Sequence, residues 1–189
     1  MSGVLLYVIG ASGSGKDSLM RHARQGLMHE NRVVFAHRYI TRPQDAGGEN
    51  HVALSEEEFA GRVQRKLFSL HWHSHGLRYG IGCELNHWLA KGMTVVVNGS
   101  RAHLAEAARH YPELVPVLIE VSPDVLRARL QQRGREDAAQ IEARLARSQS
   151  FDALQHPGML RFDNDAPLHE TGPAFIALIR TQMEAASCV

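Results

Sequence analysis

Three glycines and a lysine lie close together near the start of the chain, in the segment GASGSGK at residues 10–16. Glycines let the backbone turn tightly enough for successive N–H groups to point at one phosphate, and a lysine brings positive charge to a nucleotide's terminal phosphates. An apolar run precedes the segment and a helical pattern follows it, as the P-loop motif requires. The alternative is a glycine turn without a ligand. We expect a nucleotide-phosphate site made of Gly10, Ala11, Ser12, Gly13, Ser14, Gly15, Lys16, Asp17 and Ser18.

The residue after Lys16 departs from this motif. The motif has a serine or threonine there to hold magnesium, whereas this chain has Asp17 and places Ser18 one residue later. A carboxylate would repel the phosphates unless a divalent cation lay between them, and hard cations prefer carboxylate oxygens. We therefore expect Asp17 to hold Mg²⁺, directly or through water, and Ser18 to donate to a phosphate. The alternative is that Asp17 only stabilises the first turn of a helix.

The elements that must position this loop alternate between strands and helices. Apolar runs typical of buried strands lie at residues 4–9, 32–36, 93–97, 114–121 and 160–162. Helical patterns lie at residues 16–29, 84–91, 102–110, 123–132, 138–150 and from 169 onward, and a capping box starts a further helix at Ser55. Strands at 68–75 and 78–82 are expected to form a hairpin around Gly76, and residues 40–50 a loop. The alternation predicts an α/β fold with a parallel sheet covered on both faces.

Length and composition indicate one globular domain, residues 1–189, with 44% hydrophobic and 22% charged residues. The net charge of +1 provides no general attraction to nucleic acid or to a membrane surface, so we expect neither as a partner. Two separated cysteines, Cys83 and Cys188, favour a reducing compartment, and no apolar stretch reaches membrane-spanning length. We expect a cytoplasmic protein, and no pattern predicts its oligomeric state.

Several further segments make the chain resemble the guanylate kinase family of P-loop nucleoside monophosphate kinases over nearly its whole length. GASGSGKDSL is similar to that family's phosphate loop, and ITRP at 40–43 to the segment whose arginine binds the acceptor phosphate. The other similar segments are NHVALSEEEF at 50–59, HGLRYGI at 75–81, the arginine-bearing lid RLQQRGRED at 129–137 and IEARLARS at 141–148. The resemblance implies a three-layer P-loop NTPase fold with a small acceptor-binding insertion at about 37–82 and a lid at about 129–147.

The resemblance also implies roles for single residues on the acceptor side. Arg42 and Tyr79 match positions that bind the acceptor phosphate, and His51 stands where the family has a phosphate-binding tyrosine. Arg78 is a further candidate for that phosphate. Arg101 is a weaker one, because it follows the carboxyl end of a predicted strand, where open α/β sheets bind ligands.

On the donor side, the resemblance implies ATP and a set of arginines around the transferred phosphoryl group. Arginines outnumber lysines by 18 to 3, and a guanidinium binds phosphate with two donors at once. We expect Arg133 and Arg135 to close over that group with Lys16, and Arg144 or Arg147 to reach in from the next helix. The alternative for each arginine is an exposed helix face. Arg127 and Arg129 are expected at the surface or at the base of the lid.

The base-reading half of the family's pattern is missing. Leu70 aligns with the glutamate that reads guanine, and PQDAGGEN at 43–50 lacks the family's second arginine. A pocket without polar partners for guanine cannot select it. FSLHWHSHGLRYGIG at 68–82 and VVNGSR at 96–101 resemble one branch, the ribose 1,5-bisphosphate phosphokinases of phosphonate degradation.

That branch implies ATP-dependent phosphorylation of a sugar phosphate, ribose 1,5-bisphosphate, to 5-phospho-α-D-ribose 1-diphosphate. Two alternatives remain open. One is a nucleoside monophosphate kinase with an unusual base pocket. The other is a guanylate kinase-like binding module without catalysis, although such modules typically lose the loop lysine or the lid arginines, which this chain has.

Three histidines, His71, His73 and His75, alternate along a predicted strand. They would share one face of that strand, but no carboxylate or cysteine nearby would complete a metal site. Hydrogen bonding to the sugar or a phosphate and ordinary half-buried packing are the alternatives. Trp72 is expected in the core.

Overall fold

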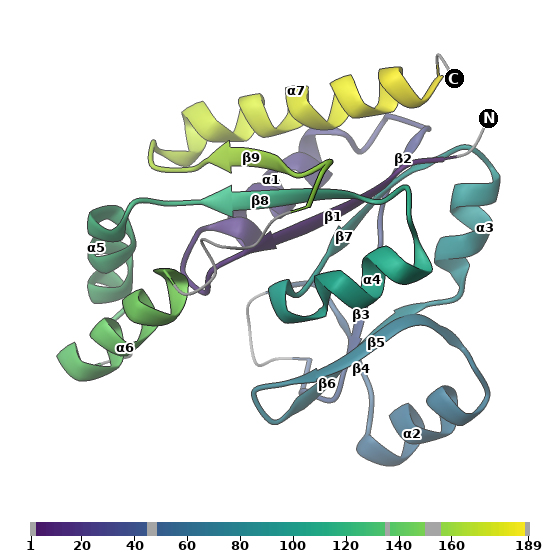
Figure 1. Cartoon of the computed structure of the whole chain (residues 1–189), viewed down its shortest axis with the longest axis horizontal. Coiled ribbons are helices and arrows are strands. Elements are labelled where there is room, and N and C mark those ends of the chain that lie inside the picture. Colours follow the sequence, from purple (N-terminus) through teal and green to yellow (C-terminus); the bar gives the residue numbers. More distant parts are fainter. Residues whose placement is uncertain (1–2, 45–48, 135–136, 150–155, 188–189) are drawn as a thin grey trace.

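A computed structural model of the chain describes residues 3–44, 49–134, 137–149 and 156–187, and Figure 1 shows how its elements are arranged. The main-sheet strands are β1 (Leu5–Gly10), β2 (Val33–Phe35), β7 (Thr94–Asn98), β8 (Val115–Glu120) and β9 (Leu160–Asp163). A smaller sheet contains β3 (Arg38–Ile40), β4 (Val52–Ala53), β5 (Phe68–Ser74) and β6 (Leu77–Gly82). The helices are α1 (Lys16–Gly26), α2 (Glu56–Gln64), α3 (Glu84–Ala90), α4 (Leu104–His110), α5 (Pro123–Arg133), α6 (Ala138–Gln149) and α7 (Leu168–Ser187), with a 3₁₀ turn η1 (Arg101–His103) before α4.

The main sheet has the order β2-β7-β1-β8-β9, and every pairing in it is parallel. Alternate residues of β1 point into two cores. Leu6 and Val8 pack with α1 and α7 on one face, whereas Leu5 and Tyr7 pack with α3 and α4 on the other. The parallel sheet covered on both faces is therefore confirmed. The sequence pattern works here because strands buried on both faces are apolar throughout.

The smaller sheet, of order β4-β3-β6-β5, is mixed and occupies the predicted insertion. The predicted hairpin is confirmed, with Gly76 at φ +74° in the turn between β5 and β6. Leu70 and Ile81 extend one of the two cores into this sheet. The sequence pattern did not indicate β3 and β4, because these short strands lie among polar residues, unlike the equally short β2, which lies in an apolar run.

The predicted lid region consists of α5 and α6, which pack against each other through a core of their own (Leu126, Leu130, Ile141 and Leu145). Ser122 caps α5, and Gly134 ends it in the left-handed region at φ +61°.

One of the two hydrogen bonds of the predicted capping box at the start of α2 is confirmed, since the Ser55 hydroxyl accepts the Glu58 backbone N–H at 3.0 Å. Within the described ranges, no helix is long and apolar enough to cross a bilayer.

Candidate active site

The glycine-rich loop joins β1 to α1. Gly13 has φ +96° and Gly15 has φ +82°, a region that glycine enters without steric cost. A Cβ at Gly10 would lie 2.8 Å from the Ser14 hydroxyl and 3.0 Å from the carbonyl oxygen of Ile119. The loop thus requires glycine at all three positions, and it presents the amino end of an eleven-residue helix, where an anion is favoured.

A cleft of about 720 Å³ opens from this loop toward the smaller sheet. Its walls come from the P-loop, the segment after β7, the β5–β6 hairpin and the helix α6. The lining residues include Gly10, Ala11, Ser12, Gly13, Gly15, Lys16, Asp17, Ser18, Arg38, Trp72, Ser74, His75, Tyr79, Ser100, Arg101 and Arg144. The cleft therefore brings together the predicted donor loop with three of the predicted phosphate-binding residues, namely Tyr79, Arg101 and Arg144.

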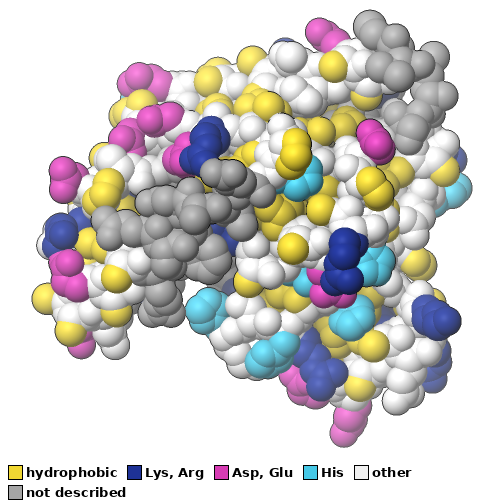
Figure 2. All heavy atoms as spheres, viewed as in Figure 1, with side chains coloured by type: hydrophobic (Ala, Val, Ile, Leu, Met, Phe, Trp, Pro, Cys, Tyr) yellow, Lys and Arg dark blue, Asp and Glu magenta, His cyan; other side chains and the backbone are white. Residues whose placement is uncertain are grey.

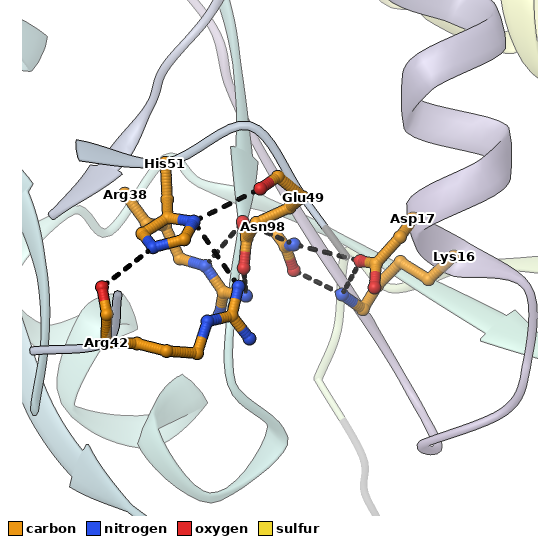
Figure 3. A network of polar contacts seen from close by, with 7 residues as sticks. All are labelled: Lys16, Asp17, Arg38, Arg42, Glu49, His51 and Asn98. Atoms are coloured by element: carbon orange, nitrogen blue, oxygen red, sulfur yellow. Dashed lines mark hydrogen bonds and ion pairs between the residues drawn. The ribbon is translucent and has the colours of Figure 1, made fainter. Parts of the chain in front are cut away.

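Behind the loop, a network of charged and amide groups links the two sheets (Figure 3). Lys16 Nζ donates to Asn98 Oδ1 and lies 3.2 Å from Asp17 Oδ1. Asn98, buried at the end of β7, donates through Nδ2 to Asp17 Oδ1 at 3.1 Å and to Glu49 Oε2 at 3.0 Å. Glu49 in turn forms an ion pair with Arg38. Cationic and anionic groups therefore alternate from the P-loop to the smaller sheet.

The electrostatics of this network act on its two P-loop members in different ways. Burial lowers the pKa of Lys16, and the nearby Asp17 only partly offsets that effect. Burial raises the pKa of Asp17, but the positive charges of Lys16 and Arg38 and a hydrogen bond from Asn98 outweigh it, so the pKa of Asp17 is lowered overall. Asp17 is therefore an ionised, half-exposed carboxylate on the cleft wall.

The back of the P-loop is held by residues from α5 and the segment after β9. Asn164 Nδ2 donates to the Ser14 carbonyl at 2.6 Å, and Arg129 donates to the same carbonyl at 3.3 Å and to the Asn164 carbonyl at 2.8 Å. The Ser14 hydroxyl is fully buried without a hydrogen-bond partner among the described residues. Arg129 thus supports the phosphate loop, a role that its place in the lid segment did not indicate.

Two predicted acceptor residues, Arg42 and His51, are not among the residues that line the cleft. His51 is buried, with Nδ1 3.1 Å from the Glu49 carbonyl oxygen and Nε2 3.1 Å from the Arg42 carbonyl oxygen. Arg42 Nη2 lies 3.3 Å from His51 Nδ1. This pair fixes the segment that carries Glu49.

The other predicted arginines fall in three places. Arg78 is on the surface of the smaller sheet, 3.0 Å from Glu56 and outside the cleft lining. Arg144 reaches the P-loop from α6, where it donates to the Ser12 hydroxyl at 2.8 Å. Arg135 and the side chains of Arg133 and Arg147 lie outside the described residues.

Trp72 is partly buried and packs against the core, as expected, but it has a second role that the sequence did not indicate. It lines the cleft and stacks on Tyr79 at 5.6 Å between ring centroids, with its other neighbour His103 at 5.3 Å. His71 and His73 are exposed on the opposite side of the strand, whereas His75 lines the cleft. Figure 2 shows histidines gathered over the smaller sheet, with acidic and basic side chains interspersed. No group of three possible metal ligands occurs among the described residues.

Comparison with known proteins agrees with this geometry. A family model described as an AAA domain matches residues 6–148. Two relatives named "Ribose 1,5-bisphosphate phosphokinase PhnN" are each 58% identical: one from Desulfomicrobium baculatum over 93% of both chains, and one from Thiobacillus denitrificans over 94% of this chain and 93% of its own. The crystal structure of guanylate kinase from Anaplasma phagocytophilum has a similar fold, with a TM-score of 0.66 at 17% identity, covering 96% of this chain and 87% of that one. The two relatives establish that this chain belongs to the ribose 1,5-bisphosphate phosphokinase family.

Proposed function

We infer that the protein transfers the γ-phosphoryl group of ATP to ribose 1,5-bisphosphate. An oxygen of the C1 phosphate attacks the γ-phosphorus, and the bond from that phosphorus to the β–γ bridging oxygen breaks. ADP leaves with the electron pair, and the sugar becomes 5-phospho-α-D-ribose 1-diphosphate. The family resemblance implies that this reaction serves phosphonate degradation.

One observation supports this inference beyond the family name. The P-loop, Lys16 and Arg144 line the cleft, but Leu70, at the position aligned with a guanine-reading glutamate, is buried at 2% exposure in the core. No carboxylate from that position can reach a base in the cleft. Trp72 and Tyr79 are stacked on each other, so the ring faces that contact each other are not available to stack on a nucleobase. A sugar phosphate without a base matches such a cleft.

The chemistry requires positive charge more than a base. The attacking phosphate oxygen is already ionised near neutral pH, whereas two polyanions must approach each other closely. Catalysis then consists of positioning and charge stabilisation. We propose that Lys16 and Arg144 bind the transferred phosphoryl group from the donor side, and that Arg133 and Arg135 close over it from the lid. Tyr79 and Arg101 are proposed to contact the acceptor. Arg42, His51 and Arg78 do not line the cleft, and we propose that they contribute positive charge to phosphate binding from a greater distance.

The residues of the loop fit both ATP and magnesium. The unpartnered, buried Ser14 hydroxyl and the positive-φ glycines form a cradle that phosphate oxygens can complete, and Asp17 offers the hard oxygen that Mg²⁺ prefers. We propose that Asp17 holds the ion, directly or through water. The ion would neutralise charge on the phosphates of the nucleotide, while Ser18 donates to a phosphate oxygen.

Phosphorus NMR of the product tests this function. With ATP, Mg²⁺ and ribose 1,5-bisphosphate, the expected spectrum gains the two coupled signals of a sugar diphosphate together with those of ADP. GMP, AMP, CMP and UMP in parallel reactions should give little or no diphosphate. Turnover of a nucleotide but not of the sugar would instead establish a nucleoside monophosphate kinase. No turnover and no ATP-induced rise in melting temperature would establish a binding module.

A further inference from the structure

Arg38, at the start of β3, is a cleft residue that the sequence analysis did not single out. Its side chain is only 12% exposed, and that of its partner Glu49 is 13% exposed. Arg38 Nε donates to Glu49 Oε2 at 2.8 Å, and Arg38 Nη2 donates to Glu49 Oε1. The carboxylate therefore holds one edge of the planar guanidinium with a two-point contact.

This arrangement leaves donors of Arg38 for another anion. A guanidinium carries five N–H donors in a fixed fork, and Glu49 engages only the Nε and Nη2 edge. Among the described residues, no other hydrogen-bond partner of the Arg38 side chain occurs. Arg38 lines the cleft, whereas Glu49 lines a smaller neighbouring cavity of about 220 Å³, so the remaining donors of the guanidinium are available to an anion in the cleft.

An aromatic stack supports the same guanidinium from a second direction. The Arg38 guanidinium carbon lies 4.9 Å from the centroid of the Tyr79 ring, and that ring is stacked on Trp72 with an interplanar angle of 6°. Trp72 is stacked on His103 in turn. A cation held by a ring face and by a bidentate carboxylate has little rotamer freedom to lose on binding, so its geometry is preorganised.

The other contacts of Glu49 connect this arginine to the donor side. Asn98 bridges Glu49 and Lys16, the P-loop lysine, through its two amide atoms. The buried His51 lies 3.1 Å from the Glu49 carbonyl oxygen. Arg38 and Lys16 both line the cleft, so an anion bound there can contact both cations.

Building on the function proposed above, we propose that Arg38 binds the C1 phosphate of the acceptor, the group that receives the phosphoryl group, and that Glu49 positions Arg38. The C1 phosphate is favoured over the C5 phosphate because it must lie beside the γ-phosphate of ATP, and Arg38 is joined to Lys16 through only Glu49 and Asn98. A purely structural ion pair is the competing explanation, but a buried pair of this kind contributes little net stability.

Steady-state kinetics of Arg38→Met tests the proposal against a matched control. Arg62 has equivalent partners outside the cleft, since it pairs with Glu58 at 2.8 Å and lies 4.9 Å from the centroid of the Tyr39 ring. Arg38→Met should raise the KM for ribose 1,5-bisphosphate about 10- to 150-fold, the loss typical of a charge-assisted hydrogen bond. The KM for ATP should stay within about twofold of wild type, and Arg62→Met should change neither.

Two further variants keep the test decisive if Arg38→Met folds poorly. Arg38→Lys keeps the charge without the fork and should have a KM for the sugar between those of wild type and Arg38→Met. Glu49→Gln should raise the same KM, and the double variant Arg38→Met, Glu49→Gln should be no worse than Arg38→Met alone, because Glu49 acts through Arg38. Additive losses, or equal effects of Arg38→Met and Arg62→Met, would overturn the proposal.

Ribose 1-phosphate as acceptor identifies the phosphate that Arg38 binds. The fold loss in kcat/KM caused by Arg38→Met should be the same with ribose 1-phosphate as with ribose 1,5-bisphosphate. A loss that disappears when the C5 phosphate is absent would refute the assignment to C1. Failure of the wild-type enzyme to use either sugar would instead refute the proposed function, so the two failures are distinguishable.

Discussion

Replacing Lys16 by Met should remove most of the stabilisation that ATP gives to the folded protein. The Lys16 side chain is 13% exposed, and its ammonium is fixed by Asn98 and Asp17 at the cleft wall. A hydrogen bond to a charged group contributes about 1.5–3 kcal/mol. The substitution should therefore weaken ATP binding about 10- to 150-fold.

The magnitude can be expressed as a melting temperature. ATP at 100 times its Kd stabilises the folded state by about 2.7 kcal/mol, which for a domain of this size raises Tm by about 5–11 °C. At the same ATP concentration, Lys16→Met would be stabilised by only about 0.3–1.4 kcal/mol. Its Tm should rise by about 1–6 °C, roughly half of the wild-type shift or less.

Thermal denaturation with and without ATP and Mg²⁺ measures both shifts. Lys91→Met is the matched control, because Lys91 is exposed at the end of α3, outside the cleft lining. Its ATP-induced shift should equal that of the wild type. An unchanged shift in Lys16→Met would refute the reasoning that this lysine binds the nucleotide's phosphates.

Three further substitutions test other parts of the site and the core. Asp17→Asn should raise the Mg²⁺ concentration that gives half-maximal activity, measured by magnesium titration, and an unchanged titration would remove Asp17 as a magnesium ligand. Burial raises the pKa of Tyr7 to about 12, so the unfolded chain loses a proton first above pH 10 and stability should fall by about 1.4 kcal/mol by pH 11. Between pH 9 and 11 in urea unfolding, the stability of Tyr7→Phe should fall by about 1.4 kcal/mol less than that of the wild type, because Tyr39 and Tyr111 also have raised pKa values and still contribute to the fall. A fall of equal size in both proteins would contradict the reasoning. Arg129→Met removes donors to the carbonyls of Ser14 and Asn164 and should lower the free energy of unfolding by about 1–3 kcal/mol. If urea unfolding shows no loss, these hydrogen bonds from Arg129 do not stabilise the fold.

Much of the main sheet could be predicted because its strands and helices have local signals. The apolar runs became β1, β7 and β8 with ends shifted by a residue or so, and the P-loop lies between β1 and α1. The assignment of residues 1–189 to one domain remains a prediction. The strands β3 and β4 were not predicted, because they are short, lie among polar residues and depend on partners elsewhere in the chain.

The residues on the acceptor side of the cleft were the hardest to predict from the sequence. Arg42 and His51 were chosen by motif position, yet neither is among the residues that line the cleft, whereas Arg38 is. Nothing local distinguishes Arg38 from the other arginines. Its role depends on the antiparallel pairing of β3 with β6, which sets Ile40 opposite Tyr79, and on the return of the chain that brings Glu49 beside it.

The amino-acid sequence by itself determined the phosphate loop, since its glycines, lysine and flanking elements are adjacent in the chain and need no distant partner. The resemblance to guanylate kinases added the expectation that Leu70 stands at the guanine-reading position. Only the tertiary structure decided which arginines line the cleft and which do not, because the direction of a guanidinium depends on the carboxylate and the aromatic ring that it contacts. Those partners, Glu49 and Tyr79, come from separate segments that contact each other only in the folded chain.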